Sequence, residues 1–170
     1  MILAVDAQYN GDGVTTGKVA GVLCEGWDFP DIIETHVFHV TDVAPYEPGS
    51  FYKRELPCLK AVLARLNGNL PEVIIVDGYV DTSPGHPGLG RRLFDELEGK
   101  VVVIGVAKTA FYGAEHVEVL RGTSQRPLYV TAAGMDVAEA AERVRAMQGK
   151  YRIPEMLKTV DSLARELDRP

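Results

Sequence analysis

Two carboxylates stand where metal chemistry is expected, because each of them ends an apolar run rich in β-branched residues. Asp6 follows Ile2-Leu3-Ala4-Val5, and Asp77 follows Val73-Ile74-Ile75-Val76. Such runs are typical of strands that are buried on both faces, where an unpaired ionised carboxylate costs several kcal/mol. If the two strands are neighbours, their like charges lie close together, and a divalent cation between them would stabilise the pair. The sequence therefore predicts a metal site.

A third acidic residue is expected, because a hard cation such as Mg²⁺ takes carboxylate oxygens together with water and substrate phosphate. The candidate is Glu55, near the start of a helix predicted from about residue 51 to 67. Taken alone, Glu55 is also explained as a first-turn residue that the helix dipole favours. No cluster of histidine and cysteine indicates a structural zinc site.

Other common chemistries lack their residues. The chain has no Walker loop, no Gly-x-Gly-x-x-Gly after a strand and no Gly-x-Ser-x-Gly turn. Nucleotide-cofactor and acyl-transfer enzymes are therefore not indicated. The formal net charge of −6 argues against a general nucleic-acid coat protein. It does not exclude a nuclease, because carboxylates that bind metal ions count as negative in that sum.

Composition predicts one globular domain over residues 1–170, with 46% apolar and 25% charged residues. Cys24 and Cys58 form no disulfide framework, so we expect a reducing, cytoplasmic setting. The N-terminus enters a strand without a basic segment, and no apolar stretch approaches the length of a membrane span. We therefore expect neither a signal peptide nor a membrane protein. The sequence leaves the oligomeric state open.

The elements that must position these carboxylates follow a recognisable order. Three strands come first and are predicted to form an antiparallel meander, and alternating helices and strands follow, which favours parallel pairing. This is the plan of an α/β, ribonuclease H-like fold, with a central mixed sheet flanked by helices and with the Asp6 and Asp77 strands adjacent. The predicted strands are about 2–9, 16–25, 31–41, 72–77, 100–107, 115–120 and 127–131, and the predicted helices are about 51–67, 89–98, 136–148 and 154–168, with a loop at 78–88.

Several ordered motifs resemble those of the endonuclease V family. Tyr-x-Pro-Gly-x-x-x-x-Arg-Glu-x-Pro spans residues 46–57, and Val-Asp-Gly at 76–78 precedes His-Pro at 86–87. Ile-Gly-Val-Ala-Lys-Thr at 104–109 and Lys-Tyr-Arg-Ile-Pro-Glu at 150–155 also match. Because these motifs are spread along most of the chain and keep their order, the resemblance is specific.

The resemblance implies a metal-dependent endonuclease that acts on DNA or RNA near deaminated bases such as inosine. It implies that Asp6, Glu55 and Asp77 hold Mg²⁺ or Mn²⁺, that Lys108 neutralises the scissile phosphate, and that His86 lies near the leaving group or the metal. It further implies a loop that opens the nucleic-acid strand, in which Tyr46 stacks on bases. The residues expected to contact nucleic acid are Tyr46, Pro48, Gly49, Arg54 and Gly78.

This chain also departs from the family pattern, so the resemblance is to a divergent form of the family, and we expect a short N-terminus. Asp6 is nearly the first residue, whereas family members usually have a helical segment before their first aspartate, and the loop after Asp77 is longer and altered. The family's Gly-His is replaced by Gly134-Met135. Asp136 follows, and it is expected either to cap the next helix, with Glu139 completing a capping box, or to serve as a fourth acidic metal ligand.

Two further hypotheses stay open at this point. One is a phosphodiesterase on the same scaffold without specificity for inosine. The other is a non-catalytic nucleic-acid-binding or interaction protein, in which Met135 marks a degenerate site. The joint presence of Asp6, Glu55, Asp77 and Lys108 argues against the latter, because a site without function has no reason to keep buried like charges.

Overall fold

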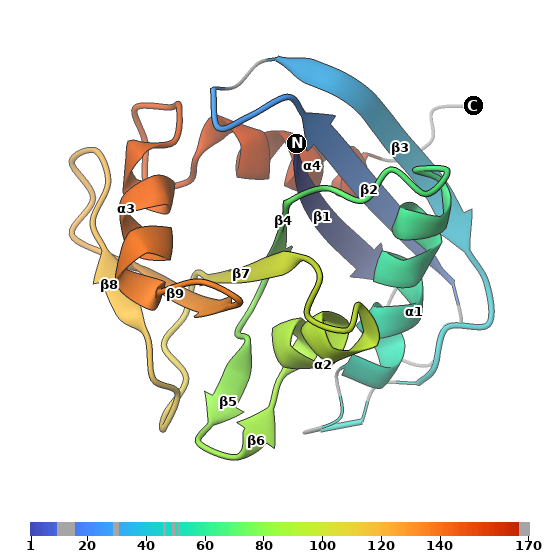
Figure 1. Cartoon of the computed structure of the whole chain (residues 1–170), viewed down its shortest axis with the longest axis horizontal. Helices are drawn as coiled ribbons and strands as arrows, with labels where there is room; N and C mark the ends of the chain where they lie inside the picture. Colours follow the sequence, from blue (N-terminus) through green and yellow to red (C-terminus); the bar gives the residue numbers. More distant parts are fainter. Residues whose placement is uncertain (10–15, 29–30, 46, 49, 51, 167–170) are drawn as a thin grey trace.

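Figure 1 shows the computed structural model, which describes residues 1–9, 16–28, 31–45, 47–48, 50 and 52–166. In this described part of the chain, no helix is both long and apolar enough to cross a membrane. The strands are β1 (Ile2–Tyr9), β2 (Gly17–Cys24), β3 (Ile32–Val40), β4 (Val73–Asp77), β5 (Asp81–Ser83), β6 (His86–Pro87), β7 (Val102–Ala107), β8 (Val117–Val119) and β9 (Leu128–Ala133). The helices are α1 (Tyr52–Ala64), α2 (Leu89–Glu96), α3 (Val137–Ala146) and α4 (Glu155–Arg165).

A seven-stranded mixed sheet forms the centre, in the order β3-β2-β1-β4-β7-β9-β8. The strands β1, β2 and β3 form an antiparallel meander, β4 and β7 run parallel to β1, and β9 and β8 are antiparallel to their neighbours. The predicted fold class and the adjacency of β1 and β4 are confirmed. The structure differs at residues 78–88, where β5 and β6 pair in a small separate hairpin instead of a plain loop.

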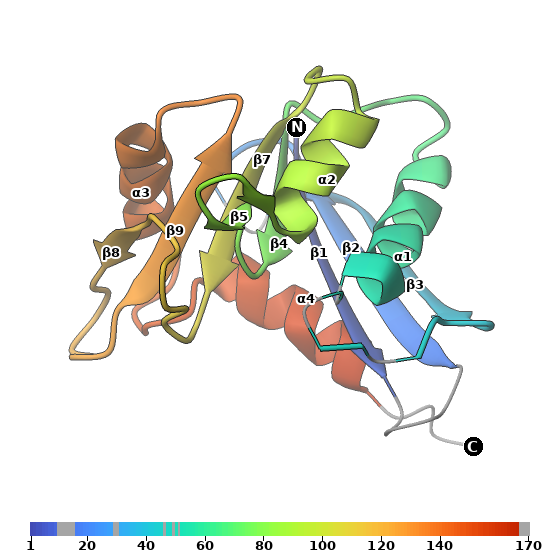
Figure 2. The same cartoon turned by 90° about the horizontal axis from the view of Figure 1, so that it is seen from below.

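Helices cover both faces of the sheet (Figure 2). Apolar side chains of α3 and α4 pack on one face, and those of α1 and α2 pack on the other. Because β4 lies between these two layers, its first four residues are all buried, which accounts for its uninterrupted β-branched sequence. The uninterrupted apolar run of β4, which predicted a buried strand, is therefore explained by the helix layers on both faces of the sheet.

The parallel strands end at one edge of the sheet. In Figure 2 the arrowheads of β1, β4 and β7 point toward α4, while that of β9 points the other way. Gly105 in the middle of β7 allows the loop after β4 to pack closely on the sheet, because a Cβ atom there would lie 2.5 Å from both the Gly78 carbonyl oxygen and Thr131 Oγ1. This close packing fixes the backbone that follows Asp77.

Candidate metal centre

Asp6 and Asp77 lie on neighbouring strands and point to the same face of the sheet. The pairing of β1 with β4 matches Val5 with Val76, so the next residue in each strand is the carboxylate. Side chains alternate between faces along a strand, and the residues two positions before each carboxylate pack in the core that α3 and α4 cover. Both carboxylates therefore face the layer that contains α4.

Asp161 of α4 brings a further carboxylate that the sequence analysis missed. It lines the same pocket as both aspartates, lies close enough to Asp6 to raise the pKa of that carboxyl, and pairs with Arg165, whose Nε lies 2.8 Å from Asp161 Oδ1. A signal for it was present. Asp161 lies four residues after Leu157 and three before Ala164, so it is a charged residue within the stripe by which α4 faces the sheet.

Glu55 belongs to the opposite layer and does not line the pocket that Asp6, Asp77, Lys108 and Asp161 share. It lies in the first turn of α1, and the pKa of Glu55 is well above its ordinary value. Burial is the largest cause, followed by the charges of Asp6 and Asp77, while the neighbouring Arg54 acts in the opposite direction. Glu55 therefore shares the electrostatic environment of the two strand carboxylates.

Lys108 provides the positive charge at this edge. Its Nζ atom lies 3.9 Å from Asp77 Oδ2 and 4.0 Å from Asp161 Oδ1, and 39% of the side chain is exposed. The Lys108 carbonyl oxygen accepts a hydrogen bond from Arg152 Nη2 at 2.5 Å. The ammonium group is thus placed between carboxylates and remains open to an incoming anion.

The pKa values of the aspartates reflect burial first and neighbouring charges second. Burial, followed by the charge of Asp77, raises the pKa of Asp6 to about 7. Desolvation also raises the pKa of Asp77, against the attraction of Lys108, although about half of that side chain is exposed. Burial would raise the pKa of Asp161 too, but hydrogen bonds with Arg165 and Asp6 outweigh it and lower the pKa. Asp6 therefore keeps its proton to a much higher pH than an ordinary aspartate does.

The donor set fits a hard divalent cation. Carboxylate oxygens are the ligands that Mg²⁺ and Mn²⁺ prefer, and a cation would relieve the repulsion that raises the pKa values of Asp6, Glu55 and Asp77. Within the described residues, no three histidine, cysteine, aspartate or glutamate side chains already converge closely enough to hold an ion. Ligation therefore requires these side chains to move closer together.

Asp136 does not join the cluster, so its prediction as a metal ligand is corrected. Because β9 is antiparallel to β7, Ala133 at the end of β9 pairs with Val103 near the start of β7, at the end of the sheet opposite Lys108. There the Asp136 side chain caps α3, accepting hydrogen bonds from the backbone N–H groups two and three residues later at 2.9 and 3.2 Å. The capping role is the one that the structure supports.

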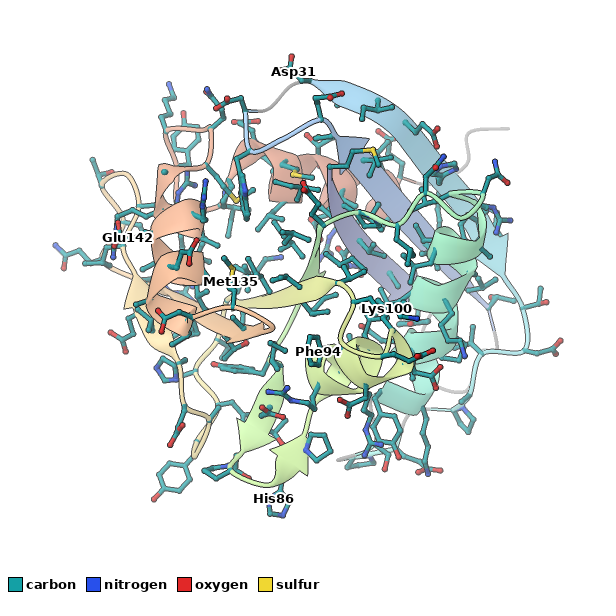
Figure 3. The ribbon with its side chains drawn as sticks, in the orientation of Figure 1. Asp31, His86, Phe94, Lys100, Met135 and Glu142 are labelled. Carbon is teal, nitrogen blue, oxygen red and sulfur yellow. The ribbon has the colours of Figure 1, made fainter. Side chains whose placement is uncertain are left out.

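Met135 and His86 also lie apart from the carboxylates. Met135 is partly buried and packs against the core beneath α3 and α4, so it replaces no member of the cluster. His86 lies on the exposed β5–β6 hairpin, with Nδ1 3.2 Å from the Pro84 carbonyl oxygen, and Figure 3 shows it pointing outward at the hairpin's end. Because His86 does not line the pocket of Asp6, Asp77, Lys108 and Asp161, the structure does not support the predicted catalytic position of His86.

Of the residues expected to contact nucleic acid, Tyr46 and Gly49 lie outside the described residues. Pro48 is exposed. Gly78 directly follows Asp77 at the sheet edge, and its φ of 119° is one that side-chain-bearing residues rarely adopt. Pro48 and Gly78 thus remain compatible with the expectation.

Arg54 differs from the expectation, because it points into the protein. It is only 6% exposed, and its guanidinium carbon lies 4.3 Å from the centre of the Tyr9 ring. In the part of the chain that the structure describes, its Nε and Nη2 atoms have no hydrogen-bond partner. As placed, Arg54 supports α1 beside Glu55 and does not face the open surface.

Comparisons with known proteins agree with this architecture. A family model described as Endonuclease V matches residues 1–162. A relative from Nostoc punctiforme, named Endonuclease V, is 27% identical over 96% of this chain and 81% of its own length. The crystal structure of Endonuclease V from Streptomyces avermitilis has 27% identity and a TM-score of 0.74, covering 96% of this chain and 79% of that one.

A structure of Endonuclease V from Ciona intestinalis gives a TM-score of 0.79 at 17% identity, covering 96% of this chain and 83% of that one. That structure is a complex with a 23mer DNA containing an inosine followed by a ribo-adenosine. At this identity the likeness concerns the fold alone, whereas the family model covers nearly the whole chain. On that match, together with the carboxylate-bearing sheet edge, this chain belongs to the endonuclease V family.

Proposed function

We propose that this protein is a metal-dependent endonuclease that hydrolyses phosphodiester bonds in DNA or RNA near deaminated bases such as inosine. The proposal is supported above all by the pocket that Asp6, Asp77, Asp161 and Lys108 line together at one sheet edge. The charges of Asp6 and Asp77 also act on Glu55. The inosine-containing DNA in the Ciona intestinalis structure supports this substrate class.

Each side chain has a role that follows from its position. Asp6 and Asp77, with Glu55 and Asp161 completing the set, would hold Mg²⁺ or Mn²⁺, which supplies an activated water and stabilises charge on the phosphate. Asp6 must give up its proton to ligate, so cation binding is favoured as the pH rises through about 7. Lys108, partly exposed beside Asp77, would pair with a non-bridging phosphate oxygen.

The strand-opening loop belongs to the same proposal. Pro48 is exposed next to the start of α1, where it can approach a nucleic-acid strand, and we assign Tyr46 and Gly49 to that loop by their motif alone. Gly78 has no side chain, so a nucleic-acid strand could come close to the backbone beside Asp77. A reducing, cytoplasmic setting fits the buried, free Cys24 and Cys58.

Cleavage of matched oligonucleotides, with and without one inosine, tests the proposal in the presence of Mg²⁺ or Mn²⁺. We expect nicking of the inosine strand only, dependent on the cation, and loss of nicking in Asp77→Asn. Asp95→Asn removes an exposed carboxylate on α2 and serves as the matched control. Equal cutting of both oligonucleotides would contradict the specificity, and unchanged cutting by Asp77→Asn would contradict the site.

A further inference from the structure

The loop after Asp77 is held rigidly at its start. The carbonyl oxygen of Tyr79 accepts a hydrogen bond from the Gly90 amide of α2 at 3.3 Å. The next residue, Val80, is 1% exposed, and its amide donates to Thr131 Oγ1 at 2.9 Å. The backbone of Tyr79 is thus anchored to both α2 and the sheet, and its side chain starts from a fixed point.

The Tyr79 side chain crosses from this loop to the segment that follows β7. Its hydroxyl donates to the Thr109 carbonyl oxygen at 2.7 Å and accepts a hydrogen bond from the Phe111 amide at 3.0 Å. The Tyr79 and Phe111 ring centres lie 6.0 Å apart. One hydroxyl therefore satisfies two backbone groups of an exposed segment that lies outside the strand.

Lys108 lies immediately before that segment. The Lys108 carbonyl oxygen accepts a hydrogen bond from Arg152, which also donates to the Pro127 carbonyl oxygen at 2.7 Å. Arg152 fixes the Lys108 backbone at the end of β7, and Tyr79 fixes the chain directly after it. The Lys108 ammonium, 3.9 Å from Asp77 and 4.0 Å from Asp161, is carried by the backbone that these two side chains hold.

We propose that Tyr79 is a positioning residue for Lys108: its hydroxyl joins the loop after β4 to the segment after β7 and so keeps the ammonium group beside the carboxylates. This inference rests on the proposed function. The hydroxyl is the essential group, because phenylalanine would keep the ring contact with Phe111 and lose both hydrogen bonds. A displacement of Lys108 by about 1 Å is enough to slow chemistry by on the order of a hundredfold.

The test compares Tyr79→Phe with Tyr129→Phe, each in the parent protein and in a Lys108→Gln background. Tyr129 lies in the same aromatic group, with its ring 5.0 Å from that of His116, and its hydroxyl makes no hydrogen bond that the described residues show. For inosine-strand cleavage with enzyme in excess, we expect Tyr79→Phe to lower the rate about tenfold with little change in binding. In the Lys108→Gln background its effect should shrink to less than about twofold, and Tyr129→Phe should match its parent.

Hydrogen exchange of the Phe111 amide gives a readout that needs no substrate. We expect faster exchange in Tyr79→Phe and unchanged exchange in Tyr129→Phe, because only the former loses the acceptor. Unchanged exchange would show that the hydroxyl does not hold this segment. An unchanged cleavage rate in Tyr79→Phe, or an equal loss in both backgrounds, would overturn the role in positioning Lys108. If the parent protein cuts no inosine strand, the proposed function fails. The exchange result alone then decides whether the Tyr79 hydroxyl holds the segment after Lys108.

Discussion

Replacing Asp6 by asparagine should stabilise the cation-free protein at alkaline pH. Asp6 is 8% exposed and lies near Asp77 and Asp161. Its Oδ1 atom accepts a hydrogen bond from the Ala7 amide at 2.8 Å, which an asparagine oxygen can retain. The asparagine amide can donate toward Asp161 as protonated Asp6 does. The side chain of the Asp6→Asn variant therefore resembles the neutral form of Asp6 at every pH.

The magnitude follows from the pKa of Asp6, which is raised from 3.8 to about 7. Because the folded-state pKa is raised, the stability contributed by the protonated form is fully present below about pH 4 and is lost as the pH rises through about 7. Each pKa unit corresponds to about 1.36 kcal/mol, so the loss approaches about 4 kcal/mol at pH 8. For a protein of this size, that is a difference in Tm of roughly 10 °C.

Thermal melts in the presence of a chelator, at pH 4 and pH 8, measure the effect. We expect Asp6→Asn and the parent to melt together at pH 4 and the variant to melt higher at pH 8. Millimolar Mg²⁺ at pH 8 should raise the Tm of the parent and not that of the variant, because the cation binds the folded carboxylate cluster preferentially. The same Tm difference at both pH values would refute the reasoning, since it would show that charge on Asp6 is not the cause.

Two further predictions concern other parts of the site. Asp161→Asn should lower inosine-strand cleavage by about a hundredfold or more, as expected for removal of a group that stabilises transition-state charge. Asp136→Asn should cleave normally, because asparagine also caps helices. The reverse ranking in a cleavage assay would assign the fourth carboxylate to α3. Gly105→Ala should lower the free energy of unfolding by about 1–3 kcal/mol in urea titrations, because its Cβ would lie 2.5 Å from the Gly78 oxygen. Gly26→Ala should change the free energy of unfolding little, because its Cβ would meet no described atom within 4 Å. Equal stabilities of the two variants would show that the loop after β4 is not closely packed.

The central part of the fold could be predicted because its signals are local. The runs before Asp6 and Asp77 contain only apolar residues, which is the pattern of strands covered on both faces, and the helix between them favours a parallel crossover. Adjacency of the two carboxylates follows from that topology and needs no knowledge of side-chain contacts. Glu55 could be found only through its motif, since its local pattern equally fits a first-turn residue.

The choice between Asp136 and Asp161 could not be made in this way. Asp136 has a clear local signal, a capping box, and that signal concerns only α3. The end of the sheet at which Asp136 lies depends on the direction of β9, which is antiparallel to β7. A short strand pattern does not reveal that direction. The place of Asp161 in the site depends on how α4 crosses the sheet edge. This tertiary feature is visible in the sequence only as one charged residue within an apolar stripe. The β5–β6 hairpin that removes His86 from the site likewise depends on pairing across a Pro-Gly turn.

The charge balance of the cluster explains how an acidic protein can act on a polyanion. Asp6, Glu55, Asp77 and Asp161 together bring four negative charges when ionised. Lys108, Arg165 and Arg54 are the cations that act on them electrostatically. With all four carboxylates ionised, as cation binding requires, these charges sum to one net negative charge, and one divalent cation changes the sum to one net positive charge. The formal charge of −6 therefore says little about nucleic-acid binding at this edge. The same carboxylates that destabilise the cation-free fold make the site's attraction for phosphate depend on the metal ion.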